Sequence, residues 1–391
     1  MKRLALAIVM LGITPAAISA LEPGGGPQRY RWNLPKGFPV PTVPVDNPMS
    51  VARAELGRYL FYDNRISGNG KQACASCHQQ KYAFADNRAL STGSTGEPGV
   101  RKSMSLVNIA YAPALTWSNP SVGTLEDQAL VPMFGKHPLE LGLNTDNRFL
   151  ALLKADSTYQ RLFKSAFPSD IKPFRLENVT RALACFERTI ISARSPYDKY
   201  HYQHDSNAIS ELAKRGEELF FSWQYNCFHC HGGFNFADSE DAARGKRRWL
   251  QYSNTGLYNV AGPISYPATN AGIYEFTKKA QDVGKFKAPS LRNVELHPPY
   301  MHDGSIATLE GVIEHYAAAG RKITEGPNKG DGSLNPNKDP RIVGFPLTPR
   351  DKKALVAFLC SLTDRSVIND PRFSDPWKPR ATSVPGAGAG H

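Results

Sequence analysis

Two short segments of the same form constrain this chain more than any other feature. Residues 74–78 read CASCH and residues 227–231 read CFHCH, so each holds two cysteines separated by two residues and followed at once by a histidine. At this spacing two thiols can add across the vinyl groups of one porphyrin while the histidine binds its iron. A redox cysteine pair or half of a zinc site would not need that histidine. The chain is therefore predicted to carry two covalent c-type haems, held by Cys74, Cys77, His78, Cys227, Cys230 and His231.

The first 20 residues have the pattern of an export signal. Lys2 and Arg3 give a positive start, residues 4–13 are apolar, and small residues precede position 21. The apolar run is shorter than the roughly 18 residues that cross a bilayer. We predict a signal peptide at 1–20, no membrane-spanning segment and a bacterial periplasmic location, because covalent haem is attached after export.

The chain has 391 residues and a formal net charge of +12. A chain of this length is expected to form about two domains. The basic excess, which includes residues in the segment 244–248, could steer an acidic partner or could be ordinary solvated surface, and the sequence leaves both open. Without an interleaved aromatic platform, nucleic-acid binding is not expected.

Helical periodicity dominates, and strand alternation is scarce. Apolar residues recur at helical spacing over 49–62, 147–167, 176–193, 210–221, 309–319 and 349–363. We predict a mainly α fold of two c-type cytochrome-like haem domains with long loops. The expected parts are an extended N-terminal arm at 21–48, an N-terminal haem domain at 49–205, a C-terminal haem domain at 206–365 and a partly disordered tail at 366–391.

Two further cysteines, Cys185 and Cys360, lie in apolar helical segments. Lone cysteines behave as small apolar residues, so buried free thiols are expected there. A disulfide between the two is the alternative.

The second half carries the segments that indicate a family. Residues 287–294 read KAPSLRNV, residues 299–304 read PYMHDG and residues 307–310 read ATLE. Together with the two haem motifs in this order, they resemble the bacterial dihaem cytochrome c peroxidase and MauG superfamily, from residue 48 to residue 364. The resemblance implies an oxidoreductase in which H2O2 reacts at the N-terminal haem and electrons pass through the C-terminal haem.

The resemblance also concerns the sixth ligand of the second iron. Peroxidase members use a methionine on the helix after the T-L-E run, and MauG-like members use a tyrosine at that place. Here the position is Tyr316, and this helix has no methionine. A phenolate stabilises high-valent iron, so the resemblance implies that His231 and Tyr316 bind this iron. His315 is an adjacent competitor, but neighbouring helix positions point in different directions.

The segments TLEDQALVPM at 124–133 and HPLELG at 137–142 resemble the distal pocket of the superfamily. The resemblance implies that Glu140 is the acid/base, which takes a proton from one peroxide oxygen and returns one to the other. Gln128 would orient the peroxide, and Pro132 would keep the sixth position of the His78 iron unligated.

Three aromatic residues match electron-transfer positions of the superfamily. Trp117 lies one residue from the position of the inter-haem tryptophan, with plain core packing as the alternative. Trp223 and Tyr225 precede the second motif, where MauG-like enzymes carry a surface tryptophan that passes a hole to their protein substrate. Either Trp223 or Tyr225 is therefore a candidate exit residue, from which the hole would pass to the protein substrate.

The superfamily commonly binds one Ca2+ between the haems through an asparagine and two backbone carbonyls. The carbonyl positions match His297 and Pro299, but the segment that resembles the asparagine-containing one carries Lys102. An ammonium group offers no acceptor to a hard cation and could itself occupy the place. This departure argues against calcium.

Within the superfamily, residues 31–39, 46–50, 103–106 and 115–117 look most like the MbnH type. That resemblance implies that H2O2 generates a bis-Fe(IV) state and that a small periplasmic partner, MbnP-like, has a tryptophan oxidised to kynurenine. Three other functions stay open: MauG-like maturation of a tryptophan-derived cofactor in an amine dehydrogenase, a cytochrome c peroxidase, and a dihaem electron-transfer protein that is not an enzyme.

Overall fold

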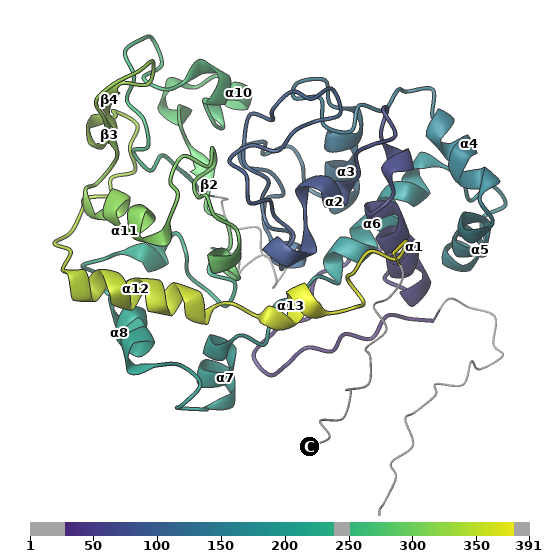
Figure 1. Ribbon diagram of the computed structural model, residues 1–391, viewed down its shortest axis with the longest axis horizontal. Helices are drawn as coiled ribbons and strands as arrows, with labels where there is room; N and C mark the ends of the chain where they lie inside the picture. The colour runs from purple at the N-terminus through teal and green to yellow at the C-terminus, as the bar shows by residue number, and fades with distance from the viewer. Residues whose placement is uncertain (1–27, 238–250, 379–391) are drawn as a thin grey trace, which may run out of the picture.

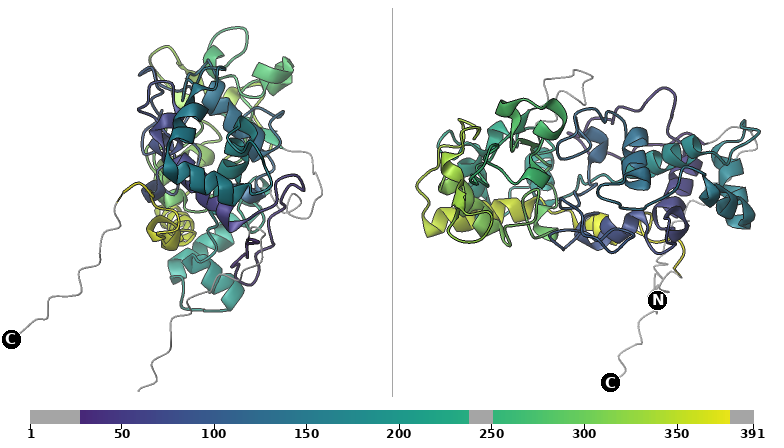
Figure 2. Two further views of the ribbon diagram at one scale, coloured as in Figure 1. Left: turned by 90° about the vertical axis from the view of Figure 1, so that its right-hand side faces the viewer. Right: turned by 90° about the horizontal axis from the view of Figure 1, so that it is seen from above.

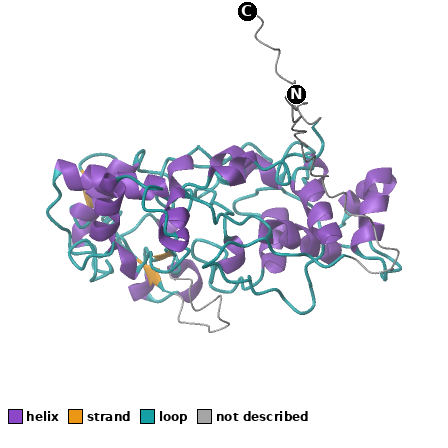
Figure 3. Cartoon of the chain, turned by 90° about the horizontal axis from the view of Figure 1, so that it is seen from below, coloured by secondary structure: helices purple, strands orange, loops and turns teal. Residues whose placement is uncertain are grey.

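The computed structural model describes residues 28–237 and 251–378, and helices joined by long loops dominate these ranges (Figures 1 and 3). The mainly α prediction is confirmed. The predicted signal peptide at 1–20 and the basic segment at 244–248 lie outside the described residues. Among the described residues, no helix has the length and apolar character needed to cross a membrane.

One group of helices precedes residue 190. It consists of α1 (Val51–Phe61), α2 (Cys74–Cys77), α3 (Leu125–Phe134), α4 (Arg148–Ala155), α5 (Ser157–Ala166) and α6 (Leu176–Arg188). α1 begins where the Ser50 side chain accepts a hydrogen bond from the backbone of Arg53. The single helix predicted over 147–167 is two helices, because Asp156 ends α4 and its side chain caps α5.

The second group consists of α7 (Pro196–Gln203), α8 (Glu211–Phe220), α10 (Tyr274–Thr277), α11 (Leu309–Ala317), α12 (Pro349–Ser361) and α13 (Arg365–Asn369). The stretch around the predicted domain boundary is helical up to Gln203, in a helix that begins with a capping box of Ser195 and Asp198. The domain boundary at 205/206 stays a prediction.

The strands are short and form two antiparallel pairs. β1 (Tyr252–Ser253) pairs with β2 (Phe286–Lys287), and β3 (Lys322–Ile323) pairs with β4 (Gly330–Asp331). Single 3-10 turns lie between the helices, at Asn64–Ile66, Gln80–Tyr82, Ile109–Tyr111, Cys227–His229, Ala268–Asn270, Ala280–Asp282, Val294–Leu296 and Gly332–Leu334.

The same helix crossing occurs twice. α1 packs on α6 at Gly57, where a Cβ atom would lie 1.9 Å from the carbonyl oxygen of Ala182. α8 packs on α12 at Gly216, where a Cβ atom would lie 2.0 Å from the carbonyl oxygen of Ala354. Only glycine permits so close an approach of two helix backbones. The crossings lie toward opposite ends of the elongated molecule (Figures 1 and 2).

Each crossing has its own apolar cluster, and the C-terminal segment joins the two. The first cluster surrounds Phe61 and Phe186, and the second surrounds Phe220 and Phe358. From α12 the chain runs through α13 back to the first group (Figure 1), where Phe373 is buried in the first cluster. The described part of the 366–391 tail, up to residue 378, is therefore packed.

The two additional cysteines are not bonded to each other. Cys185 is buried in the first group of helices beside Asn47, and Cys360 packs against the second cluster. Both are free thiols and not the alternative disulfide, but only Cys185 is buried as expected, whereas Cys360 is partly buried.

Candidate active site

The first motif folds as a single helical turn, α2, with His78 directly after it. The Nδ1 atom of His78 lies 3.0 Å from the carbonyl oxygen of Phe84. Such a contact fixes the tautomer and directs Nε2 toward a metal. Burial lowers the pKa of His78, which keeps the imidazole in the neutral form that binds iron.

The second motif repeats this arrangement. Cys227 and His229 bound a 3-10 turn, and the Nδ1 atom of His231 lies 3.1 Å from the carbonyl oxygen of Phe236. Burial lowers the pKa of His231 as well and raises the pKa of the Cys227 thiol to about 12.

A repeated segment supports both histidines. Residues 102–108 read KSMSLVN and residues 287–293 read KAPSLRN. Backbone groups of Met104 and Pro289, at the same place in the two copies, contact the two histidines. The final asparagine of each copy, Asn108 or Asn293, has the left-handed backbone conformation. The two segments were interpreted separately from the sequence, although the shared K-x-x-S-L-x-N spacing marks them as copies of one another.

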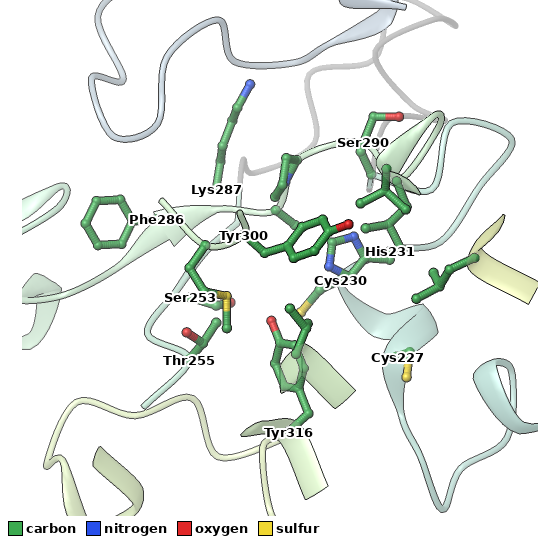
Figure 4. A pocket seen from close by; sticks show the side chains of 18 of the residues that line it. Cys227, Cys230, His231, Ser253, Thr255, Phe286, Lys287, Ser290, Tyr300 and Tyr316 are labelled. Atoms are coloured by element: carbon green, nitrogen blue, oxygen red, sulfur yellow. The ribbon is translucent and has the colours of Figure 1, made fainter. Parts of the chain in front are cut away.

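One large cavity contains the second motif. Its space, counted together with adjoining open solvent, is about 2330 Å³, and its lining includes Cys227, Cys230, His231 and Tyr316. In Figure 4, His231 and Tyr316 point toward the same space, with Cys230 between them. Much of the wall is apolar, with Val294, Leu309, Val312, Ile313, Leu355 and Leu359. Two thiols, a neutral imidazole and an apolar wall fit a covalent haem, which Cys227, Cys230 and His231 would hold in a cavity that Tyr316 also lines.

The competitor His315 is directed elsewhere. Its Nε2 atom lies 3.0 Å from the carbonyl oxygen of Thr255. Tyr316 lines the cavity, and burial raises the pKa of its phenol. Sequence analysis missed two thioethers, since Met104 and Met301 line the same cavity.

The predicted peroxide-site residues belong to α3 and to the loop after it. Gln128 and Pro132 are four residues apart on α3 and so share a face. The loop folds back on this helix, because the backbone N–H of Leu141 donates to Pro132 at 2.9 Å. The carbonyl of Glu140 accepts a hydrogen bond from Ser94 at 2.8 Å, which fixes the loop on its other side.

Glu140 lies near the first haem motif. Burial is the main cause of the raised pKa of Cys74 and Cys77, and the negative charge of the Glu140 carboxylate raises the pKa of both thiols further, so the three groups are electrostatic neighbours. Glu140 is exposed by surface area, yet protein atoms crowd its carboxyl group, and this desolvation raises the pKa of Glu140 itself. A carboxyl group with a raised pKa is suited to proton transfer near neutral pH.

Trp117 lies between the two copies of the repeated segment. Its indole N–H donates to the carbonyl of Lys102 at 2.7 Å, and its own carbonyl accepts from the backbone of Lys287 at 3.0 Å. Trp117 lines the large cavity together with His297 and Pro299, the predicted calcium-carbonyl positions.

Both lysines are buried, and burial lowers the pKa of each to about 8. The Lys102 ammonium donates to the carbonyls of Asp86 at 2.6 Å and Arg88 at 3.1 Å. The Lys287 ammonium donates to the carbonyl of Ala114 at 2.5 Å.

Trp223 and Tyr225 have opposite environments. The side chain of Trp223 is 77% exposed, and its ring lies 5.4 Å from Phe228 and 5.2 Å from His229, both inside the second motif. Tyr225 is 5% exposed and packs against Phe345. Of the two exit candidates, only Trp223 combines a surface position with contact to the motif.

The comparisons with known proteins agree with this geometry. A sequence profile described as dihaem cytochrome c peroxidase matches residues 51–207. The chain is 33% identical to the cytochrome c peroxidase IdrP1 of Denitromonas iodatirespirans over 97% of each chain. It is 30% identical to the methylamine utilization protein MauG of Methylophilus methylotrophus, over 86% of this chain and 89% of that protein.

Solved structures give the same result. A crystal structure of a MauG-like protein associated with microbial copper homeostasis aligns with a TM-score of 0.86 and 45% identity, over 89% of this chain and 100% of that one. The dihaem peroxidase BthA of Burkholderia thailandensis shares the fold, with a TM-score of 0.62 and 22% identity over 89% and 98% of the two chains. This protein therefore belongs to the dihaem cytochrome c peroxidase and MauG family of oxidoreductases.

Proposed function

We propose that this protein is a periplasmic enzyme that uses H2O2 to oxidise a tryptophan of a small protein partner, of the MbnP-like kind, to kynurenine. Bound haem would supply iron that takes oxidising equivalents from peroxide and releases them one electron at a time. Cys74, Cys77 and His78 would hold the first haem. Cys227, Cys230, His231 and Tyr316 would hold the second.

The first half supplies the proton chemistry. Glu140 accepts a proton from the near oxygen of H2O2 and returns one to the far oxygen. Gln128 orients the peroxide by hydrogen bonding, and Pro132 shares its helix face without offering a ligand to iron. The pKa of Glu140, raised by desolvation, and its electrostatic interaction with Cys74 and Cys77 support this assignment.

The observation that carries the proposal is the position of Tyr316 in the cavity of the second motif. A phenolate ligand favours oxidised iron, whereas methionine raises the potential and suits simple electron transfer. Tyr316 therefore favours a strongly oxidising enzyme over one that consumes peroxide with electrons from a cytochrome.

The exposed Trp223 supports a macromolecular substrate. Because Trp223 lies at the surface, a partner protein in contact with it could give up an electron there. The tryptophan of the partner would not have to enter either haem site. Trp117 lies between the two repeated segments and would relay charge between the haems. The 45% identity to a MauG-like protein associated with copper homeostasis further supports a substrate of the MbnP-like kind.

A cytochrome c peroxidase is the second candidate, favoured by the 33% identity to IdrP1 along nearly the whole chain. It would use a methionine at the second iron, and α11 has none. Maturation of an amine dehydrogenase cofactor would use the same haem sites, so only the partner distinguishes it.

The test adds an excess of H2O2 to the diferric holo-protein with an MbnP-like candidate partner, an amine dehydrogenase precursor, or reduced cytochrome c. Excess peroxide is needed because the conversion of tryptophan to kynurenine removes more electrons than one H2O2 accepts and releases one ring carbon as formate. The proposal predicts mass gain at a tryptophan of the MbnP-like protein and slow oxidation of cytochrome c. Rapid turnover with cytochrome c and no mass gain on either protein would support the peroxidase instead.

A further inference from the structure

A run of aromatic rings leads from Trp117 into a third apolar cluster, which surrounds Tyr258, Tyr266 and Phe286. The Trp117 and His302 ring centroids are 6.5 Å apart. The His302 and Tyr266 centroids are 6.2 Å apart, and those of Tyr266 and Tyr258 are 5.3 Å apart. Electronic coupling falls steeply with distance, so rings this close offer a continuous path for an electron.

The run ends at a phenol with a proton acceptor. Tyr258 is buried, and its hydroxyl donates to Oδ2 of Asp303 at 2.5 Å. The other oxygen of Asp303 accepts the backbone N–H of Ser305 at 3.0 Å, which fixes the carboxylate. Burial and this bond raise the pKa of Tyr258 to about 12, so the phenol keeps its proton in the resting protein.

A tyrosine that loses an electron becomes strongly acidic. Inside an apolar cluster a radical cation is costly, because an isolated buried charge has no solvent to stabilise it. A carboxylate already hydrogen-bonded to the phenol can take the proton with little movement. Trp117, by contrast, donates to a neutral backbone carbonyl, and Nε2 of His302 has no hydrogen-bond partner.

We propose that Tyr258 and Asp303 form an internal one-electron donor to the oxidised haem centre. The electron would leave Tyr258 by way of Tyr266, His302 and Trp117. The O–H bond of Tyr258 breaks, an O–H bond forms on Asp303, and one oxidising equivalent delivered by peroxide is consumed. The products are a neutral tyrosyl radical and a protonated carboxyl group. The inference rests on the proposed function, because H2O2 is the oxidant.

The pair therefore gives the protein a second destination for oxidising equivalents besides Trp223. When no partner is bound near Trp223, the oxidising equivalent can stay on Tyr258. Other side chains of the protein are then not oxidised. Because Tyr258 is buried in the third apolar cluster, a radical on this residue does not contact partner proteins.

The test mixes the diferric holo-protein with one equivalent of H2O2 and no partner, and freezes samples for electron paramagnetic resonance. A tyrosyl signal is expected in the wild type, narrowed by ring-deuterated tyrosine. Tyr258→Phe, which removes only the hydroxyl, should lose the signal. Asp303→Asn, which keeps an oxygen for Ser305, should reduce it strongly. A nitroso spin trap followed by peptide mass spectrometry should label Tyr258.

Two matched variants act as controls. Tyr252→Phe removes a buried phenol without a hydrogen-bond partner, and Tyr159→Phe removes a phenol bonded at 2.7 Å to the carboxylate of Asp63, outside the aromatic run. Both should keep the signal.

Two failures are distinguishable. If peroxide changes the haem absorption normally but the signal is absent from the wild type, or survives in Tyr258→Phe, the inference is wrong and the proposed function stands. If peroxide leaves the haem absorption unchanged, both are wrong.

Discussion

The indole ring of Trp223 lies 5.2 Å from the imidazole ring of His229, the residue that precedes the second cysteine of the CFHCH motif. Phe228 of the same motif stacks on His229 at 4.3 Å and contacts the same indole. An exposed, easily oxidised ring is therefore joined by two aromatic contacts to the segment that would carry the second haem.

Replacing Trp223 by phenylalanine should slow electron transfer to a protein partner. Phenylalanine fills part of the same space but is much harder to oxidise. We expect the rate with the partner to fall at least about tenfold, equivalent to about 1.4 kcal/mol. Stopped-flow decay of the oxidised state checks this, with peroxide reactivity unchanged. Tyr225→Phe is the matched control, and a slower rate there but not in Trp223→Phe would reverse the assignment.

Glu140→Gln should slow the reaction with H2O2 by about 10²- to 10⁴-fold, the range for loss of a general base. Glu140 must be ionised to accept the peroxide proton. Because burial raises its pKa, the wild-type rate should fall as pH drops, at a higher pH than for an ordinary glutamate. Stopped-flow absorption from about pH 4 to 8 measures this fall. The exposed Glu97→Gln is the control. A Glu140→Gln variant as fast as wild type would remove Glu140 from the reaction.

Gly57→Ala should destabilise the fold although alanine favours helices. The added Cβ would lie 1.9 Å from the backbone of Ala182, and such overpacking costs about 1–3 kcal/mol. Denaturant unfolding of the holo-protein measures the change. At Gly99 an added Cβ meets nothing closer than 3.5 Å, so Gly99→Ala should be near neutral. Equal stability of the two variants would contradict the close crossing of α1 and α6.

Treatment with a calcium chelator should change neither the haem spectra nor the thermal stability of the protein. The Lys102 ammonium already satisfies the carbonyls of Asp86 and Arg88, and an ammonium repels a nearby cation. The chelator EGTA is expected to leave the haem spectra and the melting midpoint unchanged. A midpoint that falls with EGTA and returns with Ca2+ would show that calcium binds despite Lys102. Lys102→Met should cost about 1–3 kcal/mol for each carbonyl left without a donor.

The sequence predicted features that depend on local chemistry. The cysteines and histidine of each haem motif are adjacent in the chain, so their spacing alone indicates their role. Apolar residues recur at helical spacing over 49–62, 210–221, 309–319 and 349–363, and the structure has a helix at each. The family expectation, read from segments such as KAPSLRNV, is confirmed.

Features that depend on tertiary packing were not predictable. The choice between Trp223 and Tyr225 required knowing which ring is buried. The break at Asp156 depends on a side-chain cap that competes with helix continuation. The Tyr258 and Asp303 pair joins residues 45 positions apart, and its partners become visible only when the chain is folded.

We propose that Tyr316 would join His231 in holding the second haem, which would make the two haem sites unequal. Resonance Raman spectroscopy of the diferric holo-protein tests it most directly, with Tyr316→Phe beside the control Met301→Leu, which removes a thioether of the same cavity. The claim predicts tyrosinate–iron vibrations in the wild type and in Met301→Leu, and their loss in Tyr316→Phe. A spectrum that Tyr316→Phe leaves unchanged would contradict it.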